Sequence, residues 1–456
     1  MTSSTYWLEH AWLGGAHRGL SNGAVVMMAG GRFASVEVGI AVVPEGAVVL
    51  RGLTVPGFAN AHSHAFHRAL RGRTHGNGGT FWTWRDVMYS VAERLNPDTY
   101  FALARAVFGE MALAGISCVG EFHYLHHGPG GLPYSNANAM GEAVIAAAGE
   151  AGIRITLLDT LYRRGGLSPA GEPLTLSPLQ ERFCDPSVGS WAERVASISS
   201  PAGGSQHALV GHAVHSVRGV GRDELNAVGR LDLAGPMHAH VSEQVGENTA
   251  CEAAYGESPL KVLASAGVVH DRFTAVHATH VTDADVAAFG GRNALCCMCP
   301  STERDLADGI GRARDFANAG ARLCLGSDSH AVIDIVEEAR LMEYHERLER
   351  QNRGVFSADE LLRAATVNGH ESLGWFDAGT IASGARADLV TVGMGGVSMA
   401  GAGVHELDSA LIFGSSARDI THVVVDGRVI VRDGRHVGFD VAAALHTSVT
   451  DLLDAQ

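Results

Sequence analysis

The chain has 456 residues, of which 46% are hydrophobic and 18% are charged. This balance is typical of a globular protein with a large core, and it excludes a disordered or fibrous chain. The 34 basic and 49 acidic residues give a formal charge of −15, so the surface repels phosphate backbones and anionic lipids. We therefore expect no binding to nucleic acids or membranes. The count of 24 histidines points to metal or acid–base chemistry.

The start of the sequence and its cysteines predict a cytoplasmic protein. Residues 1–12 lack the basic and apolar segments of a signal peptide, and no apolar run is long enough to span a bilayer. The seven cysteines are an odd number without an export signal, which is typical of reduced thiols. The run Cys296-Cys297-Met298-Cys299 could bind a soft metal. A buried strand is favoured, because no second cysteine pair lies at zinc-finger spacing.

The chain opens with short alternating strands and glycine turns over residues 5–55. Apolar runs then alternate with longer amphipathic or alanine-rich segments. Eight of these runs are predicted strands, ending near Ala61, Glu121, Asp159, His215, Val241, His277, Cys299 and Gly326. The predicted helices include residues 97–114, 137–151, 259–266, 311–319, 333–350 and 357–373. Residues 165–178 look like a surface loop.

Alternating strands return over residues 380–440, where Asp426-Gly427 between two valine runs predicts a hairpin. Eight strands alternating with helices are the pattern of a (β/α)₈ TIM barrel, whose active site lies at the carboxyl ends of the strands. We predict an α/β fold with this barrel at residues 56–375. Residues 1–55 and 376–445 would form a small β-sandwich domain from both termini, and residues 446–456 a C-terminal tail.

Two histidines end the first predicted barrel strand, in the run His62-Ser63-His64. Residues at i and i+2 of a strand share a face, so both imidazoles can point into the barrel mouth. His238 and His240 form a second pair of this kind, so the spacing alone does not select a site.

The position of these residues at strand ends is more informative. Each further candidate follows a different predicted strand: His215, His240, His277 and Asp328. Such groups converge on one rim, as a catalytic metal requires. Several imidazoles and one carboxylate suit Zn²⁺, with other first-row ions as alternatives. Glu243, just past the fifth strand, is well placed to move protons beside the metal.

These residues together resemble the amidohydrolase superfamily, in the deaminase branch that uses one metal. The resemblance covers nearly the whole chain, and it implies a distorted barrel with a small β domain. More narrowly, the sequence resembles the family of N-formimino-L-glutamate deiminases. The supporting segments are residues 62–66, 81–85, 88–89, 121–127, 215–218, 276–280, 299–303 and 326–330.

The resemblance implies a role for each residue. One divalent ion, with Zn²⁺ favoured, would be bound by His62, His64, His240 and Asp328. Glu243 and His277 would assist proton transfer, and Asp328 would also accept a proton from water. The substrate pocket would be lined by His67, Arg85, Tyr124, His215 and Arg218.

The resemblance also selects His240 over His238 and His277 over His280, which the spacing leaves open. The family has a substrate-contacting Gln where this chain has His67, and an imidazole can still donate a hydrogen bond to a carboxylate.

The expected reaction is hydrolytic deimination of N-formimino-L-glutamate to N-formyl-L-glutamate and ammonia in histidine degradation. This small dicarboxylate needs cationic donors, which Arg85 and Arg218 supply. Two alternatives are another deaminase of the superfamily acting on a purine or related heterocycle, and a non-catalytic barrel that binds a partner. A non-catalytic barrel is expected to have lost its metal ligands, yet the expected ligands are present in this chain. Many barrel enzymes of this size form homodimers, so a homodimer is possible.

Overall fold

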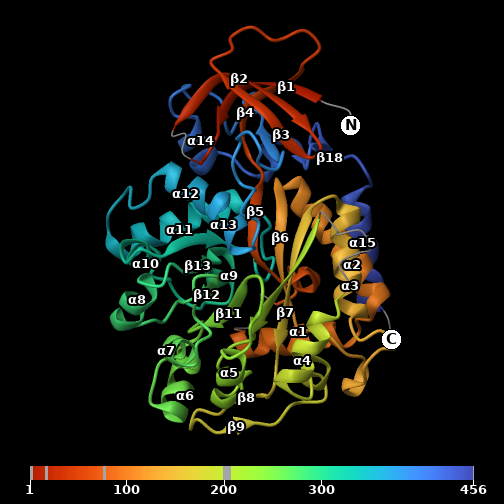
Figure 1. The fold of residues 1–456 in the computed structure, drawn as a ribbon, viewed down its shortest axis with the longest axis vertical. Helices are drawn as coiled ribbons and strands as arrows, with labels where there is room; N and C mark the ends of the chain where they lie inside the picture. Colours follow the sequence, from red (N-terminus) through yellow and green to blue (C-terminus); the bar gives the residue numbers. More distant parts are fainter. Residues whose placement is uncertain (1–3, 16–18, 75, 77–78, 199–206, 455–456) are drawn as a thin grey trace.

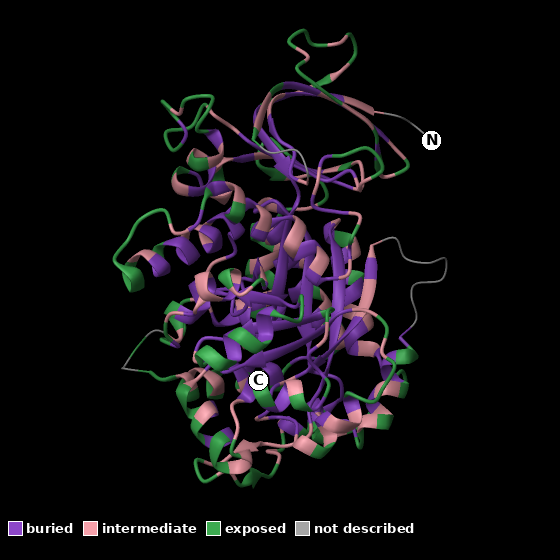
Figure 2. Ribbon diagram, turned by 60° about the vertical axis from the view of Figure 1, so that its left-hand side comes forward, coloured by how far each residue is buried: buried purple, intermediate pink, exposed green. Residues whose placement is uncertain are grey.

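A computed structural model describes residues 4–15, 19–74, 76, 79–198 and 207–454 (Figure 1). Its centre is a sheet of eight parallel strands in the order β14-β13-β12-β11-β10-β7-β6-β5. In chain order these strands are β5 (Phe58–Ser63), β6 (Ile116–His123), β7 (Arg154–Leu161), β10 (Ala208–Val214), β11 (Met237–Val241), β12 (Phe273–His277), β13 (Leu295–Met298) and β14 (Arg322–Leu325). The predicted barrel of eight strands is confirmed, and its interior is buried throughout (Figure 2).

Helices surround this sheet. Those between or after its strands are α2 (Pro97–Leu113), α3 (Ala139–Ala151), α4 (Val188–Ala196), α5 (Arg222–Val228), α6 (Val245–Tyr255), α7 (Pro259–Ser265), α8 (Asp283–Gly290), α9 (Pro300–Asp305), α10 (Ala313–Asn318), α11 (Ile335–Arg350), α12 (Ala358–Ala365) and α13 (Val367–Ser372). The predicted helix over residues 357–373 is two helices, because the backbone at Thr366 leaves the helical region. Side chains cap many of these helices; Asn96 at the start of α2, for example, accepts two backbone N–H groups.

The barrel closes at the carboxyl ends of its first and last strands. Ser63 forms a parallel bridge with Asp328, whose N–H donates to the His62 carbonyl at 3.0 Å. Below this bridge, the Asn60 side chain donates to Ser327 Oγ at 2.7 Å and accepts from the Ser327 N–H at 3.0 Å. A Cβ on Gly326 would stand 2.7 Å from the His62 Cβ, so only glycine permits this approach. We call these contacts the closing seam.

The terminal segments form a second sheet of eight strands, in the order β18-β17-β16-β15-β4-β1-β2-β3. Its strands are β1 (Ser4–Trp12), β2 (Leu20–Ala29), β3 (Arg32–Val38), β4 (Val48–Pro56), β15 (Leu389–Val392), β16 (Ile420–Val425), β17 (Arg428–Arg432) and β18 (Arg435–His436). The sheet curls above the barrel, and β4 pairs with both β1 and β15. Strands from both ends of the chain therefore share one separate sheet, as predicted.

The predicted hairpin joins β16 and β17. Asp426 and Gly427 have φ angles of 47° and 73°, which a two-residue turn of this type requires. The predicted strands over residues 380–440 are interrupted by a helix, because α14 (Leu407–Gly414) lies between β15 and β16. Residues 446–454 of the predicted tail lie in α15 (Val441–Asp454), next to α2 (Figure 1). The domain boundaries themselves stay predictions, and residues 1–3, 16–18 and 455–456 of those ranges lie outside the described residues.

No helix in the described ranges is both long and apolar enough to cross a membrane. The seven cysteines are all free thiols, and six of them are buried. Cys296 and Cys297 lie on β13, as the interpretation of this run as a buried strand predicted.

A buried ion-pair network connects the barrel to the terminal sheet. Arg154 at the start of β7 donates to Asp388 at 2.9 Å and to Asp426 at 3.0 Å, and it is fully buried. Burial alone would raise the pKa of the Asp388 carboxyl, but Arg154 holds it below its ordinary value. The barrel and the terminal sheet are therefore joined by the buried pair Arg154 and Asp388, where water cannot replace a lost partner.

We predict that Arg154→Ala destabilises the protein by about 3–5 kcal/mol, because it removes the ion-pair partner of the buried Asp388 carboxylate. The free energy of unfolding from urea titrations measures the effect. Arg51→Ala is the matched control: its 3.8 Å pair with Glu9 is exposed, so the loss should be below about 1 kcal/mol. Equal losses for both variants would contradict the structural role of Arg154.

Candidate active site

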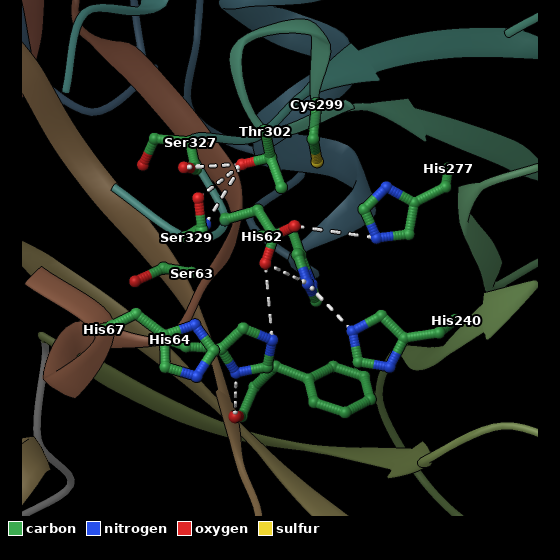
Figure 3. A network of polar contacts seen from close by, with 12 residues as sticks. His62, Ser63, His64, His67, His240, His277, Cys299, Thr302, Ser327 and Ser329 are labelled. Carbon is green, nitrogen blue, oxygen red and sulfur yellow. Dashed lines mark hydrogen bonds and ion pairs between the residues drawn. The ribbon is translucent and has the colours of Figure 1, made fainter. Parts of the chain in front are cut away.

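Four imidazoles and one carboxylate meet at the carboxyl ends of the barrel strands. His62 lies on β5, His64 directly follows it, His240 lies on β11 and His277 on β12, and the four rings face a common centre (Figure 3). Asp328 Oδ1 lies 3.4 Å from His62 Nε2 and 3.5 Å from His64 Nε2. His240 Nε2 lies 3.2 Å from His62 Nε2. The structure thus brings together the four predicted ligands.

The hydrogen bonds of these imidazoles suit a cation at their centre. His64 Nδ1 donates to the Phe122 carbonyl at 3.0 Å, and His240 Nδ1 donates to the His215 carbonyl at 2.9 Å. Each Nε2 therefore carries a lone pair that points toward the Asp328 carboxylate or another imidazole. Burial lowers the pKa of His64 to about 3 and keeps the ring neutral. Converging lone pairs and one carboxylate fit a divalent metal ion.

The backbone at the rim is held in an uncommon conformation. His277 and Asp328 have φ angles of 67° and 40°, in the left-handed region that favours glycine. Such strain persists only where surrounding contacts hold it, and it gathers at functional sites. The closing seam holds Asp328, while the Ala278 N–H donates to the Val241 carbonyl next to His277.

His277 is surrounded by carboxylates. Its Nε2 lies 3.6 Å from Asp328 Oδ2 and 3.8 Å from Glu243 Oε1, while its Nδ1 lies 3.6 Å from Glu303 Oε1. Burial alone would lower the pKa of His277, but these carboxylates, Glu243 foremost, raise it to about 10. The ring can therefore serve as a cationic hydrogen-bond donor at neutral pH.

Arg218 holds Glu243 at the rim. Its guanidinium donates to Glu243 Oε2 at 2.7 Å and lies 3.3 Å from Glu247 Oε2. Burial would lower the pKa of Arg218, and the two carboxylates raise it. Arg218 thus has two counter-charges inside the protein, in addition to any substrate it meets.

A cavity opens beside this rim. Its lining includes His64, His240, Glu243 and Asp328, together with all five predicted substrate-binding residues, His67, Arg85, Tyr124, His215 and Arg218. One wall is α1 (Phe81–Glu93), which supplies Phe81, Trp82, Trp84, Arg85, Met88 and Tyr89. Another wall is the short hairpin β8 (Gly166–Leu167) and β9 (Pro173–Leu174). The segment predicted to be a surface loop therefore also lines the cavity.

Unlike Arg218, Arg85 has no counter-charge among the described residues. Within the described residues it makes no ion pair, and its buried Nε has no hydrogen-bond partner. Its guanidinium instead stacks on the Trp82 and Tyr89 rings, at 4.6 and 5.4 Å from their centres. Arg85 is therefore free to receive an anionic group in the cavity.

The remaining predicted pocket residues form one polar wall. His67, on the 3₁₀ helix η1 (Ala65–Leu70), places Nε2 3.1 Å from the Tyr124 hydroxyl. The His215 ring lies 4.6 Å from that of Tyr162 and 5.1 Å from that of His240. Burial lowers the pKa of both His67 and His215, so these rings are neutral donors or acceptors.

Comparison with known proteins places the chain in a family. Residues 53–430 match the model of the amidohydrolase family. The chain belongs to the amidohydrolase family. It is 37% identical over 424 residues to formimidoylglutamate deiminase of Pseudomonas aeruginosa, covering 90% of this chain and 92% of that protein. The narrower resemblance found in the sequence is thereby confirmed.

The chain is also similar to other deaminases and amidohydrolases. A 5-methylthioadenosine/S-adenosylhomocysteine deaminase of Natronomonas pharaonis is 27% identical, over 84% of this chain and 82% of that protein. Among solved structures, an amidohydrolase from Brucella melitensis matches with a TM-score of 0.90 and 31% identity, over 99% of this chain and 100% of that one. An adenosine deaminase from Xanthomonas campestris with bound zinc shares the fold, with a TM-score of 0.83, 21% identity and 99% and 98% coverage.

In this amidohydrolase, the two histidines that the spacing left open as alternative site residues bind elsewhere. His238 donates from Nε2 to the Ser372 carbonyl at 2.9 Å, and His280 donates to the Asp308 carbonyl at 2.7 Å. Sequence reasoning missed Glu303 and Glu247, which contact His277 and Arg218. Residues 299–303 are among the segments that carry the family resemblance. No spacing rule, however, connects the Glu303 carboxylate with His277 on another strand.

The lone-pair arrangement predicts which variants lose metal. His240→Ala removes one of the converging donors, so metal affinity should fall by at least roughly 10–100-fold, the cost of losing even an indirect partner. Metal content after dialysis, measured per chain, tests this. His238→Gln, on the same strand, and Glu243→Gln should both keep the metal. Loss of metal from the Glu243 variant would instead make that carboxylate a ligand.

Proposed function

We propose that this amidohydrolase hydrolyses N-formimino-L-glutamate to N-formyl-L-glutamate and ammonia. In this deimination the oxygen of water bonds to the formimino carbon, and the bond from that carbon to its terminal nitrogen breaks. The observation that carries the proposal is Arg85, which has no counter-charge in the described part of the chain and lines a cavity beside the rim of predicted metal ligands. The 37% identity to a formimidoylglutamate deiminase over 90% of the chain supports it.

We propose Zn²⁺, one ion per chain, bound by His62, His64, His240 and Asp328. When bound, such an ion supplies Lewis-acid polarisation and lowers the pKa of water. Zinc prefers neutral imidazoles, and backbone carbonyls fix the Nδ1 protons of His64 and His240.

Three residues of the chain would handle protons and charge. Asp328 accepts a proton from the attacking water. Glu243, fixed by Arg218 at 2.7 Å, carries a proton to the substrate nitrogen that leaves as ammonia. His277, whose pKa is raised by the carboxylates around it, donates a hydrogen bond to the oxygen that gains negative charge.

The substrate carboxylates would be bound away from the rim. Arg85 offers a planar, unpaired guanidinium for one of them. Arg218 would bind the second carboxylate of the substrate. Its guanidinium also contacts Glu243 and Glu247, so it would keep Glu243 in place at the same time. His67 and Tyr124 add neutral hydrogen-bond groups on the facing wall.

We also propose that the enzyme works in histidine degradation in the cytoplasm, as its free thiols fit a reducing compartment. We also propose that the enzyme forms a homodimer.

A substrate panel with ammonia detection tests the reaction. We expect turnover of N-formimino-L-glutamate and at most weak turnover of guanine, adenosine or 5-methylthioadenosine. The aromatic side chains on α1 could stack on a base, so the purines are the informative comparison. Preference for a heterocycle would replace the deiminase proposal with the alternative deaminase.

Arg85→Ala separates carboxylate recognition from chemistry. Loss of a charge-assisted hydrogen bond of about 1.5–3 kcal/mol should lower kcat/KM for N-formimino-L-glutamate by about 10–150-fold. An uncharged formamidine is the control substrate, and its turnover should change little. If both substrates lose activity equally, Arg85 does not bind the carboxylate.

A further inference from the structure

Next to the four predicted ligands lies a second set of donors. His277, Cys299 and Asp328 offer one nitrogen, one sulfur and one oxygen atom that all lie within 4.8 Å of one another. His277 and Cys299 are fully buried, and Asp328 is 5% exposed. Neither ring nitrogen of His277 has a hydrogen-bond partner among the described residues. Figure 3 shows the Cys299 sulfur on the same side of the rim as His277.

Asp328 belongs to both sets through different oxygens. Its Oδ1 faces His62 and His64 at 3.4 and 3.5 Å, whereas its Oδ2 faces His277 at 3.6 Å. A carboxylate divided in this way has the geometry to bridge two cations, as in sites with two metal ions about 3.5–4 Å apart. We propose that His277, Cys299 and Asp328 form a second metal site, for a thiophilic divalent ion, that inhibits the enzyme when filled.

The donor types restrict which ions can bind. A thiolate and an imidazole favour Cd²⁺ and excess Zn²⁺ over Mg²⁺ or Mn²⁺, which prefer oxygen ligands. Metal binding requires the thiolate form of Cys299 and an unprotonated ring nitrogen of His277, so a bound ion must displace both protons. Only an ion with a strong bond to sulfur does this, and the second site should therefore fill after the first.

Inhibition follows from His277 and rests on the proposed function. An ion on its Nε2 would remove the hydrogen-bond donor that we assign to the developing charge, and would separate His277 from Glu243, now 3.8 Å away. Metal binding itself does not depend on the identity of the reaction.

The test uses the full chain loaded with one equivalent of Zn²⁺ and then titrated with Cd²⁺. We expect a second bound ion by metal analysis and the ultraviolet absorption band of a cadmium thiolate. Cys299→Ser should abolish the band and raise the inhibitory Cd²⁺ concentration at least about tenfold, because it removes a direct ligand. Cys299→Ala provides a second variant should serine disturb the packing.

Cys296→Ser is the matched control, since Cys296 is equally buried on β13 but outside the donor set. It should keep the band, the second ion and the inhibition. Persistence of the band in both Cys299 variants would overturn the proposal, as would binding of only one ion by the unaltered chain. A second ion bound through Cys299 in a chain that releases no ammonia would refute the deiminase function and leave the second site standing.

Discussion

The closing seam is the constraint on which the site depends. Barrel strands that begin far apart in the chain must meet where β5 and the segment after β14 exchange backbone hydrogen bonds, at His62, Ser63 and Asp328. Three of the predicted metal-binding residues, His62, His64 and Asp328, therefore also close the barrel through their backbones. Asn60 and Gly326 fix the register of this contact, so an error of one residue would turn the imidazoles away from the rim.

Charge around the rim is arranged in two groups. Burial keeps the imidazoles of His62, His64 and His240 neutral; His62 and His64 face the Asp328 carboxylate, and His240 faces His62. His277, less than 4 Å from three carboxylates, has a raised pKa instead. The same residue type thus supplies metal donors and a cationic group within one site, and the difference comes from the neighbouring carboxylates alone.

The sequence predicted the barrel strands because each is a short apolar run that alternates with a longer amphipathic or alanine-rich segment. It could not predict α1, since Phe81, Trp82 and Trp84 favour strands as readily as helices. The predicted metal donors were selected by their place at strand ends, and the structure brings these residues together. Glu303 and Glu247 were not selected, because their roles depend on contacts to His277 and Arg218, which lie on other strands or loops. The ion-pair network at Arg154 was not predicted for the same reason, since its partners Asp388 and Asp426 lie far away in the sequence.

The cavity and the seam are built from different parts of the chain. The predicted metal donors lie on or just after buried barrel strands, and those at β5 and after β14 also close the barrel. By contrast, α1 and the β8–β9 hairpin, which form much of the cavity wall, lie outside the barrel sheet. Mutations in those two segments can reshape the space around a substrate without touching the reactive rim. Such a separation gives the scaffold evolvability: one hydrolytic centre can be inherited unchanged while descendants diverge in the molecules they accept.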